Sequence, residues 1–258
     1  MSELIKQLIV VCPLVFLAGF VDSVAGGGGL ISLPAYLMVG LPARIASGTN
    51  KVVAGCGTLV SSANYLRSGK VLLRVAIPTA LCALLGSSLC TQLAAGLSDG
   101  TLKILLLAAL PAVAIFLAVK KDFGKDDSVT EKEMSRKKEL LISCGIGLVM
   151  GAYDGLIGPG TGTFYIMLFT AFLGCNLLTA SGCAKIANLA SNIASATVWA
   201  LNGDVMWQLV IPAAVFNMLG NYCGSRFAIR GGSQRVRSMI FLVLGLLFVK
   251  VICDLIGN

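Results

Sequence analysis

Four ionisable side chains interrupt stretches of the chain that are otherwise apolar. They form two acid–base sets, Asp22 with Lys51 and Asp154 with Lys185. A charge at the centre of a bilayer costs about 3 kcal/mol or more, so such residues are candidates for function. The alternative is structural: Asp22 could form a buried salt bridge with Lys51 or with Lys185 that only holds parts of the molecule together. The sequence leaves both readings open.

A glycine-rich stretch follows each aspartate, at Gly26–Gly29 and at Gly158–Gly162. Glycine permits the positive φ angles at which successive N–H groups point to one place, and the helix that follows adds a partial positive charge. The pattern predicts anion-binding turns made by Gly27, Gly28, Gly29, Gly160, Thr161 and Gly162. Neither stretch ends in the Gly-Lys-Ser/Thr of a nucleotide-binding loop. Close packing of helices is the alternative explanation for these glycines.

Amide side chains accompany both lysines. Asn50 precedes Lys51, whereas Asn188 and Asn192 follow Lys185 on one face of a predicted helix. These amides could line a polar pathway or join helices by hydrogen bonds, and the pattern favours neither. Two pairs of aromatic residues have separate predicted roles: the tyrosines reach the site (Tyr36 and Tyr165) and the tryptophans anchor the chain at the membrane surface (Trp199 and Trp207).

The composition is that of a polytopic membrane protein. Of 258 residues, 57% are hydrophobic and 12% are charged, with a mean hydropathy of +0.89. A soluble domain carries about 25% charged residues, so disorder, a coiled coil, a nucleic-acid-binding domain and a secreted disulfide scaffold are excluded. The chain has no His, and its nine Cys form no CxxC pair. We therefore expect no catalytic residue, no metal site, no cofactor and no enzymatic activity.

Apolar windows predict ten helical segments and no strands, hence an all-α fold. The first half holds segments 4–21, 29–41, 45–66, 71–95 and 101–119, and the second half holds 138–153, 160–175, 179–201, 205–225 and 236–256. Some are shorter than the roughly 20 residues of a straight membrane span. We expect the first two segments of each half to form a broken or re-entrant hairpin that enters and leaves on one side. The N-terminal apolar stretch lacks a cleavage site, so we expect it to be retained.

The two halves repeat each other. Asp22 and Asp154 lie 132 positions apart, and Lys51 and Lys185 lie 134 apart, as do Pro78 and Pro212 or Gly86 and Gly220. A constant offset over this length indicates a duplication. It divides the chain into an N-terminal membrane repeat (1–119), a hydrophilic linker (120–139) and a C-terminal membrane repeat (140–258).

Basic residues change places between the repeats. The loop after 45–66 carries Arg67, Lys70 and Arg74, whereas its partner carries Asp204. The loop after 71–95 carries Asp99 and Lys103, whereas its partner carries Arg226, Arg230, Arg235 and Arg237. By the positive-inside rule, the repeats have opposite orientations, and the linker lies in the cytoplasm. Such inverted-topology repeats bind substrates between the repeats, near the bilayer midplane.

The segment from Gly19 to Gly29, the Thr49-Asn50-Lys51 triplet and the segment from Tyr153 to Gly162 resemble the sulfite/anion exporter family, the TauE/SafE type, over nearly the whole chain. The resemblance implies a multi-pass protein of the bacterial inner membrane that moves sulfite, sulfoacetate or related sulfonates, in the direction of export. The second half has Cys183-Ala184 in place of Thr49-Asn50, so its half of the site is expected to differ.

The leading hypothesis is a secondary transporter for a small anion, with a lipid bilayer as its partner and no nucleic acid. The sequence leaves open whether a second copy of the chain is also a partner. Lys51 and Lys185 supply positive charge, the glycine turns supply N–H groups, and Asp22 and Asp154 act as coupling or structural charges. In the alternative hypothesis, the two aspartates bind a cation and the lysines neutralise the empty site. A passive channel and an intramembrane enzyme or assembly subunit are further alternatives.

Overall fold

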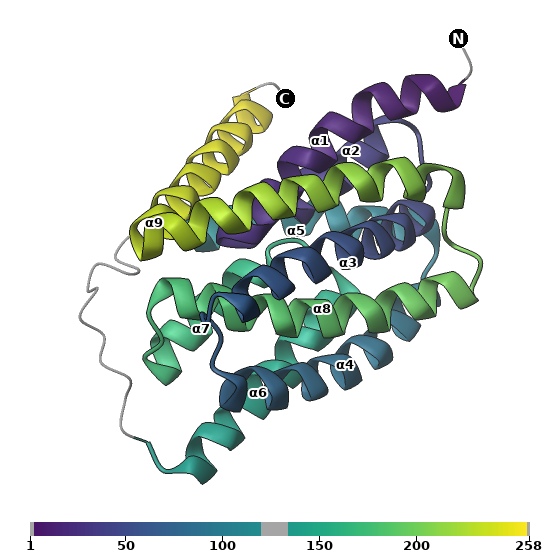
Figure 1. Ribbon diagram of the computed structural model, residues 1–258. Helices are drawn as coiled ribbons and strands as arrows, with labels where there is room; N and C mark the ends of the chain where they lie inside the picture. The colour runs from purple at the N-terminus through teal and green to yellow at the C-terminus, as the bar shows by residue number, and fades with distance from the viewer. Residues whose placement is uncertain (1–2, 120–133, 257–258) are drawn as a thin grey trace.

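The computed structural model describes the backbone of residues 3–119 and 134–256, and the side chains of residues 4–109 and 134–242. Within these ranges the chain forms nine helices and no strands (Figure 1). The helices are α1 (Glu3–Ala25), α2 (Gly29–Met38), α3 (Ala43–Arg67), α4 (Leu73–Ala95), α5 (Asp99–Val119), α6 (Arg136–Leu156), α7 (Thr161–Leu173), α8 (Leu177–Leu201) and α9 (Trp207–Ile256). The prediction of an all-helical fold is confirmed over the described ranges.

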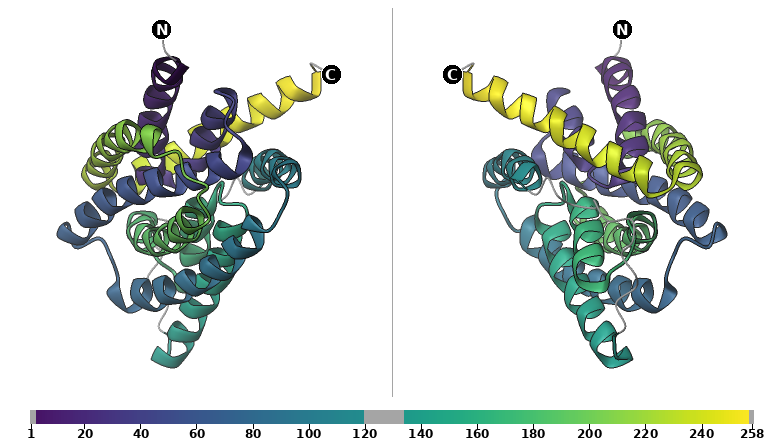
Figure 2. Two further views of the ribbon diagram at one scale, coloured as in Figure 1. Left: turned by 90° about the vertical axis from the view of Figure 1, so that its right-hand side faces the viewer. Right: turned by 90° about the vertical axis from the view of Figure 1, so that its left-hand side faces the viewer.

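The predicted segments match these helices except at some of their ends. Helix α1 continues through Asp22 to Ala25, and α6 continues through Asp154 to Leu156, so both aspartates lie inside helices rather than after them. The separate segments predicted at 205–225 and 236–256 are confirmed as the two helical arms of α9, which meet at a kink at Gly232, where φ is 66°. The loop expected between them is replaced by helical backbone at every residue except Gly232. A single glycine can make this break without a loop. The two arms of α9 therefore point in different directions (Figures 1 and 2). Most of the predicted linker, 120–133, lies outside the described residues.

Helices from the two halves of the chain pack against each other. Helix α1 lies along α9, and α4 lies along α6, while α3 and α8 run through the centre (Figure 1). The central pair carries most of the buried polar side chains, including Thr49, Ser61, Ser191 and Ser195. Such residues are tolerated in an apolar chain because the neighbouring helices cover them and supply hydrogen-bond partners.

Close backbone contacts recur at positions that the repeat relates. A Cβ atom at Gly48 of α3 would collide with the carbonyl oxygen of Asp204, and one at Gly182 of α8 would collide with that of Lys70. Gly48 and Gly182 are 134 positions apart in the sequence, and so are Lys70 and Asp204. The contact of Gly86 with Leu148 on α6 likewise has its counterpart in that of Gly220 with Phe16 on α1. Only glycine lets the two backbones approach this closely.

The charged loops collect at two ends of the molecule. At the acidic end, Arg44 donates from its backbone N–H to Asp99 at 3.0 Å and from Nη2 to Asp204 at 2.8 Å. At the basic end, the turn after α3 and the region of α9 before its kink share a surface pocket. There, Nε of Arg74 is 3.1 Å from Oε1 of Glu139 at the start of α6. Loops of similar charge thus meet in space, as the sequence pattern indicates.

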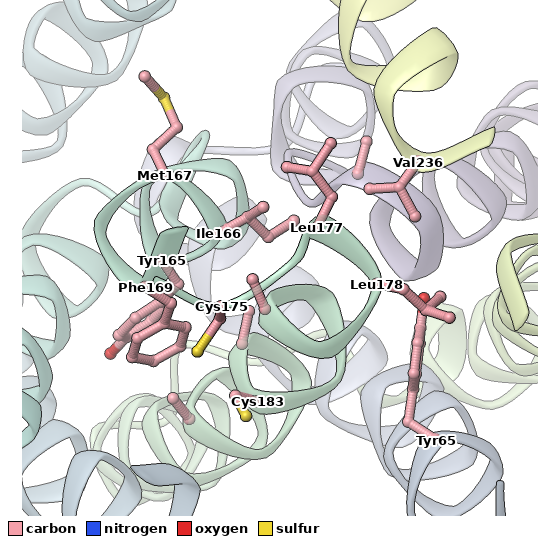
Figure 3. Packing of buried hydrophobic residues seen from close by; sticks show 14 of the residues in the cluster. Tyr65, Tyr165, Ile166, Met167, Phe169, Cys175, Leu177, Leu178, Cys183 and Val236 are labelled. Atoms are coloured by element: carbon pink, nitrogen blue, oxygen red, sulfur yellow. The ribbon is translucent and has the colours of Figure 1, made fainter. Parts of the chain in front are cut away.

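Two clusters of apolar residues fill the interior. One surrounds α7 and the start of α8, where the rings of Tyr165 and Phe169 stack with centroids 5.7 Å apart (Figure 3). The other lies around Tyr36, Trp199 and Leu209. Large aliphatic side chains such as Leu141 and Leu201 are exposed on the outside. Among the described residues, three helices are long and apolar enough to cross a membrane: Leu4–Ala25, Leu73–Ala95 and Arg136–Leu156.

Candidate functional site

A cavity of about 60 Å³ lies between the two halves of the chain. Helices α1, α2 and α3 of the first half and α6, α7 and α8 of the second half contribute to its wall, together with α9. The polar and charged side chains that line it are Asp22, Ser32, Ser47, Asn50, Lys51, Asp154, Thr161, Asn188, Asn192 and Asn217. The volume is enough for a few water molecules or one small ion.

The first ion pair joins α3 to α6. The Nζ atom of Lys51 is 2.7 Å from Oδ2 of Asp154, and their side chains are 9% and 6% exposed. Both residues line the cavity. A lysine ammonium has three N–H donors, so the contact with Asp154 occupies only part of its capacity.

The second ion pair joins α8 to α1. The Nζ atom of Lys185 donates to Oδ2 of Asp22 at 2.8 Å. The other carboxylate oxygen of Asp22 accepts a hydrogen bond from the backbone N–H of Gly28 at 3.2 Å. Lys185 has no exposed surface and does not line the cavity, whereas Asp22 does. Asp22 therefore connects a buried cation to the turn that starts α2.

The glycine turn before α2 packs directly on the start of α7. Gly26 and Gly27 have φ angles of 73° and 87°. A Cβ at Gly26 would overlap the backbone of Gly162 and Thr163, and the Thr163 hydroxyl donates to the carbonyl of Ala25 at 3.0 Å. The two turns are thus one continuous piece of the cavity wall.

The turn before α7 has its own hydrogen bonds. Gly158 and Gly160 have φ angles of 88° and 83°. The hydroxyl of Tyr153 donates to the carbonyl of Pro159 at 2.6 Å, and that of Thr161 donates to the carbonyl of Gly158 at 2.6 Å. The first turns of α2 and α7 both line the cavity, so two helix N-termini with partial positive charge face it.

Polar residues of the two central helices, α3 and α8, have two roles: they line the cavity, and they join helices by hydrogen bonds. Asn188 and Asn192 line the cavity, and Asn192 also approaches the hydroxyl of Thr58 at 3.4 Å. Ser195 instead contacts the hydroxyls of Ser87 and Thr91 on α4, at 2.7 and 2.8 Å. Residues of the polar face therefore line the cavity, join helices or, as Asn192 does, do both. A polar pathway across the membrane stays a prediction.

The structure brings the predicted site residues together with one exception. The residues that line the cavity are Asp22, Gly27, Gly28, Gly29, Asn50, Lys51, Asp154, Gly160, Thr161, Gly162, Asn188 and Asn192. Lys185 lies behind this wall. Tyr36 and Tyr165 are fully buried in the apolar clusters and are not among the lining residues, so the expectation that they reach the site was wrong.

Sequence reasoning misplaced one aromatic residue and missed one amide. Trp199 is 1% exposed and lines the cavity, so it is not a surface anchor; Gly48 packs against its Cβ. Trp207 is 56% exposed. Asn217 on α9 is buried, lines the cavity and donates to the carbonyl of Val15 at 3.0 Å. Its position in an apolar segment, four residues before Asn221, was the available signal.

This arrangement can hold a small charged solute. Lys51, the two helix N-termini and the amides of Asn50, Asn188 and Asn192 are donors, whereas Asp22 and Asp154 are acceptors that face the same cavity. Helices with aliphatic outer surfaces and a polar cavity between two halves define the class of membrane transport proteins.

Comparisons with known proteins also indicate a membrane transporter. The chain matches the family model described as "Sulfite exporter TauE/SafE" over residues 11–251, and it belongs to that family of membrane transporters. It is 32% identical to a probable membrane transporter protein, ORF9, of Sinorhizobium, over 93% of this chain and 90% of the relative. It is also 32% identical to one from Haemophilus influenzae, over 93% and 92% of the two chains, and 31% identical to YfcA of Escherichia coli, over 99% and 96%. No solved structure matches the chain.

Proposed function

We propose that this protein is a secondary transporter that exports a small sulfur-containing or organic anion, of the sulfite, sulfoacetate or sulfonate class, across the bacterial inner membrane. The observation that carries the proposal is the cavity at which the Lys51 ammonium and the first turns of α2 and α7 converge. The family description supports the anion class. We further propose that the protein acts as a transporter rather than as an enzyme.

In this proposal, the anion binds between Lys51 and the two glycine turns. The ammonium of Lys51 forms an ion pair with Asp154 and has three N–H donors, so donors remain for the anion. The amides of Asn50, Asn188 and Asn192 replace the water that the anion loses. Lys185 acts indirectly, because it holds Asp22, and Asp22 holds Gly28. The charges of Asp22, Lys51, Asp154 and Lys185 sum to zero. The site therefore accepts an anion through the dipoles of the two helix N-termini and through a change of hydrogen-bonding partners at Lys51.

The proposed mechanism is alternating access by two inverted-topology repeats, 1–119 and 140–258. The repeat-related contacts of Gly48 and Gly182, and the two cross-repeat ion pairs, support an approximate two-fold relation between them. The hydrogen bond from Gln7 to the carbonyl of Val39 supports a first hairpin whose ends lie together. The positive-inside rule assigns the basic end to the cytoplasm and the acidic end to the outside.

Flux into liposomes tests this function. Purified protein is reconstituted and uptake of sulfite, sulfoacetate and a simple alkyl sulfonate is measured. We expect Lys51→Gln to weaken the apparent affinity for the transported anion by roughly 10- to 100-fold, the value of a hydrogen bond to a charged group. The matched control is Lys103→Gln, which removes an exposed lysine outside the cavity. Saturation and trans-stimulation of the parent distinguish a carrier from a channel. Undiminished affinity in Lys51→Gln would contradict the proposed site.

One observation favours a second candidate, a transporter that binds or couples to a cation. Both carboxylates line the cavity, but only one of the two lysines does. Reversal potentials in asymmetric salt separate the candidates. Movement of a cation without an anion, abolished by Asp22→Asn or Asp154→Asn, would support the second candidate.

A further inference from the structure

A second hollow lies at the basic end, between the end of α3 and the middle of α9. Its volume is about 410 Å³, and residues from both halves of the chain line it. From the first half come Asn64, Arg67 and Ser68, and from the second half come Tyr222, Arg226 and Arg230. None of them lines the central cavity, so this pocket is a separate site.

The pocket is strongly cationic. Three arginines line it, and no Asp or Glu does. The guanidinium of Arg226 lies over the ring of Tyr222, 4.5 Å from its centroid, which holds the planar group in place and leaves its edge free to donate. The C-terminus of α3 contributes only about half a negative charge against these three positive charges. A guanidinium can bind a phosphate group with two parallel hydrogen bonds, so the charge and the donors of this pocket suit a phosphate.

Exposed apolar side chains lead up to the pocket along both helices. Leu59 and Leu66 on α3 are 56% and 44% exposed, and Phe216 and Leu219 on α9 are 41% and 51% exposed. In a membrane-spanning protein, these surfaces face the acyl chains of lipids. The arginines therefore lie where the apolar surface ends and the headgroup layer begins. A free phosphate would use the arginines alone, whereas a phospholipid uses both surfaces.

We propose that the pocket between α3 and α9 binds the headgroup phosphate of an anionic phospholipid, with the acyl chains along the two helices. The bound lipid joins the two halves of the chain close to a direct contact between them, the hydrogen bond from Asn64 Nδ2 to Ser225 Oγ at 2.8 Å. It thereby stabilises the contact of α3 with α9. This proposal does not depend on which solute the central cavity transports.

Native mass spectrometry of the full chain in detergent, titrated with phosphatidylglycerol or phosphatidylcholine, tests this proposal. We expect retention of phosphatidylglycerol and little retention of phosphatidylcholine. A basic residue near an anionic headgroup changes affinity about fivefold, so the combined Arg67→Gln, Arg226→Gln and Arg230→Gln substitutions should weaken phosphatidylglycerol binding by roughly 100-fold. The matched control substitutes three exposed basic residues at the start of α6, Arg136→Gln, Lys137→Gln and Lys138→Gln, and should bind like the parent.

Further arms identify the source of the phosphate and guard against misfolding. Inorganic phosphate and glycerol phosphate should not displace the lipid at millimolar concentration; displacement by either would overturn the assignment to a lipid. The single variant Arg230→Gln should weaken binding about fivefold even if the triple variant fails to fold. Equal phosphatidylglycerol binding by the parent and the pocket variants, or equal losses in the pocket and control triples, would also overturn the proposal.

Discussion

Lys51 and Asp154 form a buried ion pair, 2.7 Å from Nζ to Oδ2, between a helix of the first half and a helix of the second. Its repeat-related counterpart is the pair of Lys185 with Asp22, at 2.8 Å. Each aspartate thus pairs with the lysine of the other half of the chain. The two pairs differ in exposure, since only the first has its lysine on the cavity wall.

Breaking the first pair on one side should destabilise the protein strongly. In Lys51→Met, the carboxylate of Asp154 is left buried without its partner, and such a change costs about 3–5 kcal/mol. Asp154→Leu should cost a similar amount. The double variant should recover most of this loss, because it buries no uncompensated charge, yet it should not transport. Unfolding in detergent and liposome flux measure the two properties.

A control pair shows what burial contributes. Arg74 and Glu139 are 3.1 Å apart, but the side chain of Arg74 is 58% exposed. The coupling energy from a double-mutant cycle there should be at most about 1 kcal/mol. If the coupling of Lys51 with Asp154 were no larger than this, the pair would not be the buried element that the proposed site requires.

The glycine turn before α2 should tolerate no side chain. Gly26→Ala forces a residue with a Cβ into a φ of +73°, at about 1–2 kcal/mol, and also drives the Cβ into the backbone of Gly162. We expect a larger loss of stability than the conformational term alone, and loss of transport. Thermal unfolding and flux of the purified variant measure this.

Gly40 provides the matched control. Its φ is +82°, close to that of Gly26, but nothing lies within 4 Å of an added Cβ. Gly40→Ala should therefore show the conformational cost alone, with transport retained. Equal effects of the two substitutions would mean that the contact between the turns is unimportant.

The sequence was sufficient to predict which residues gather at the central cavity, but not how the charged residues pair. Charged residues in apolar segments need partners, and the constant offset related the two sets, so convergence of Asp22, Lys51 and Asp154 could be predicted. Which lysine meets which aspartate depends on how the halves pack, and local sequence does not encode that. Lys185 and Trp199 illustrate the same limit, because whether a side chain lies on a cavity wall or behind it is decided by neighbours distant in the chain.

The predicted ends of some helices were wrong for a different reason. The region near Gly231 and Gly232 has the charge of a loop, yet helical backbone continues on both sides and only Gly232 leaves it.

Asn217 was missed because its repeat partner is Ala83, so the repeat gave no signal there. Asn217 thus adds to the asymmetry of the cavity that the different placement of Lys51 and Lys185 already creates.

The proposed inverted arrangement of the two repeats predicts that equivalent turns lie on opposite sides of the membrane. Ser68 and Asn202 are both exposed and differ by 134 positions, and they follow α3 and α8 respectively. In intact cells, a membrane-impermeant maleimide should label Asn202→Cys, whereas Ser68→Cys should be labelled only after permeabilisation. Labelling is compared with that of the parent chain, which contributes its own cysteines. Labelling of both variants from the same side would contradict inverted repeats.

The ion pair at the acidic end should control access to the cavity from that end. Arg44 joins the start of α3 to the loop between α8 and α9 through Asp204, and to the start of α5 through Asp99. A partly exposed pair of this kind contributes about 1 kcal/mol, so its loss should shift the balance between closed and open states roughly fivefold. The labelling rate of Ser47→Cys, a cavity-lining position on α3, should rise by that factor when Arg44→Gln is added.

The opposite end supplies the control for this prediction. Arg74→Gln removes an ion pair of similar length at the basic end, so it should not accelerate labelling of Ser47→Cys from the acidic end. Applied from the basic end, the reagent should show the reverse order of the two substitutions, because opening one end in an alternating-access cycle requires closing the other. An increase from both ends in either variant would indicate a pore that opens throughout rather than a carrier.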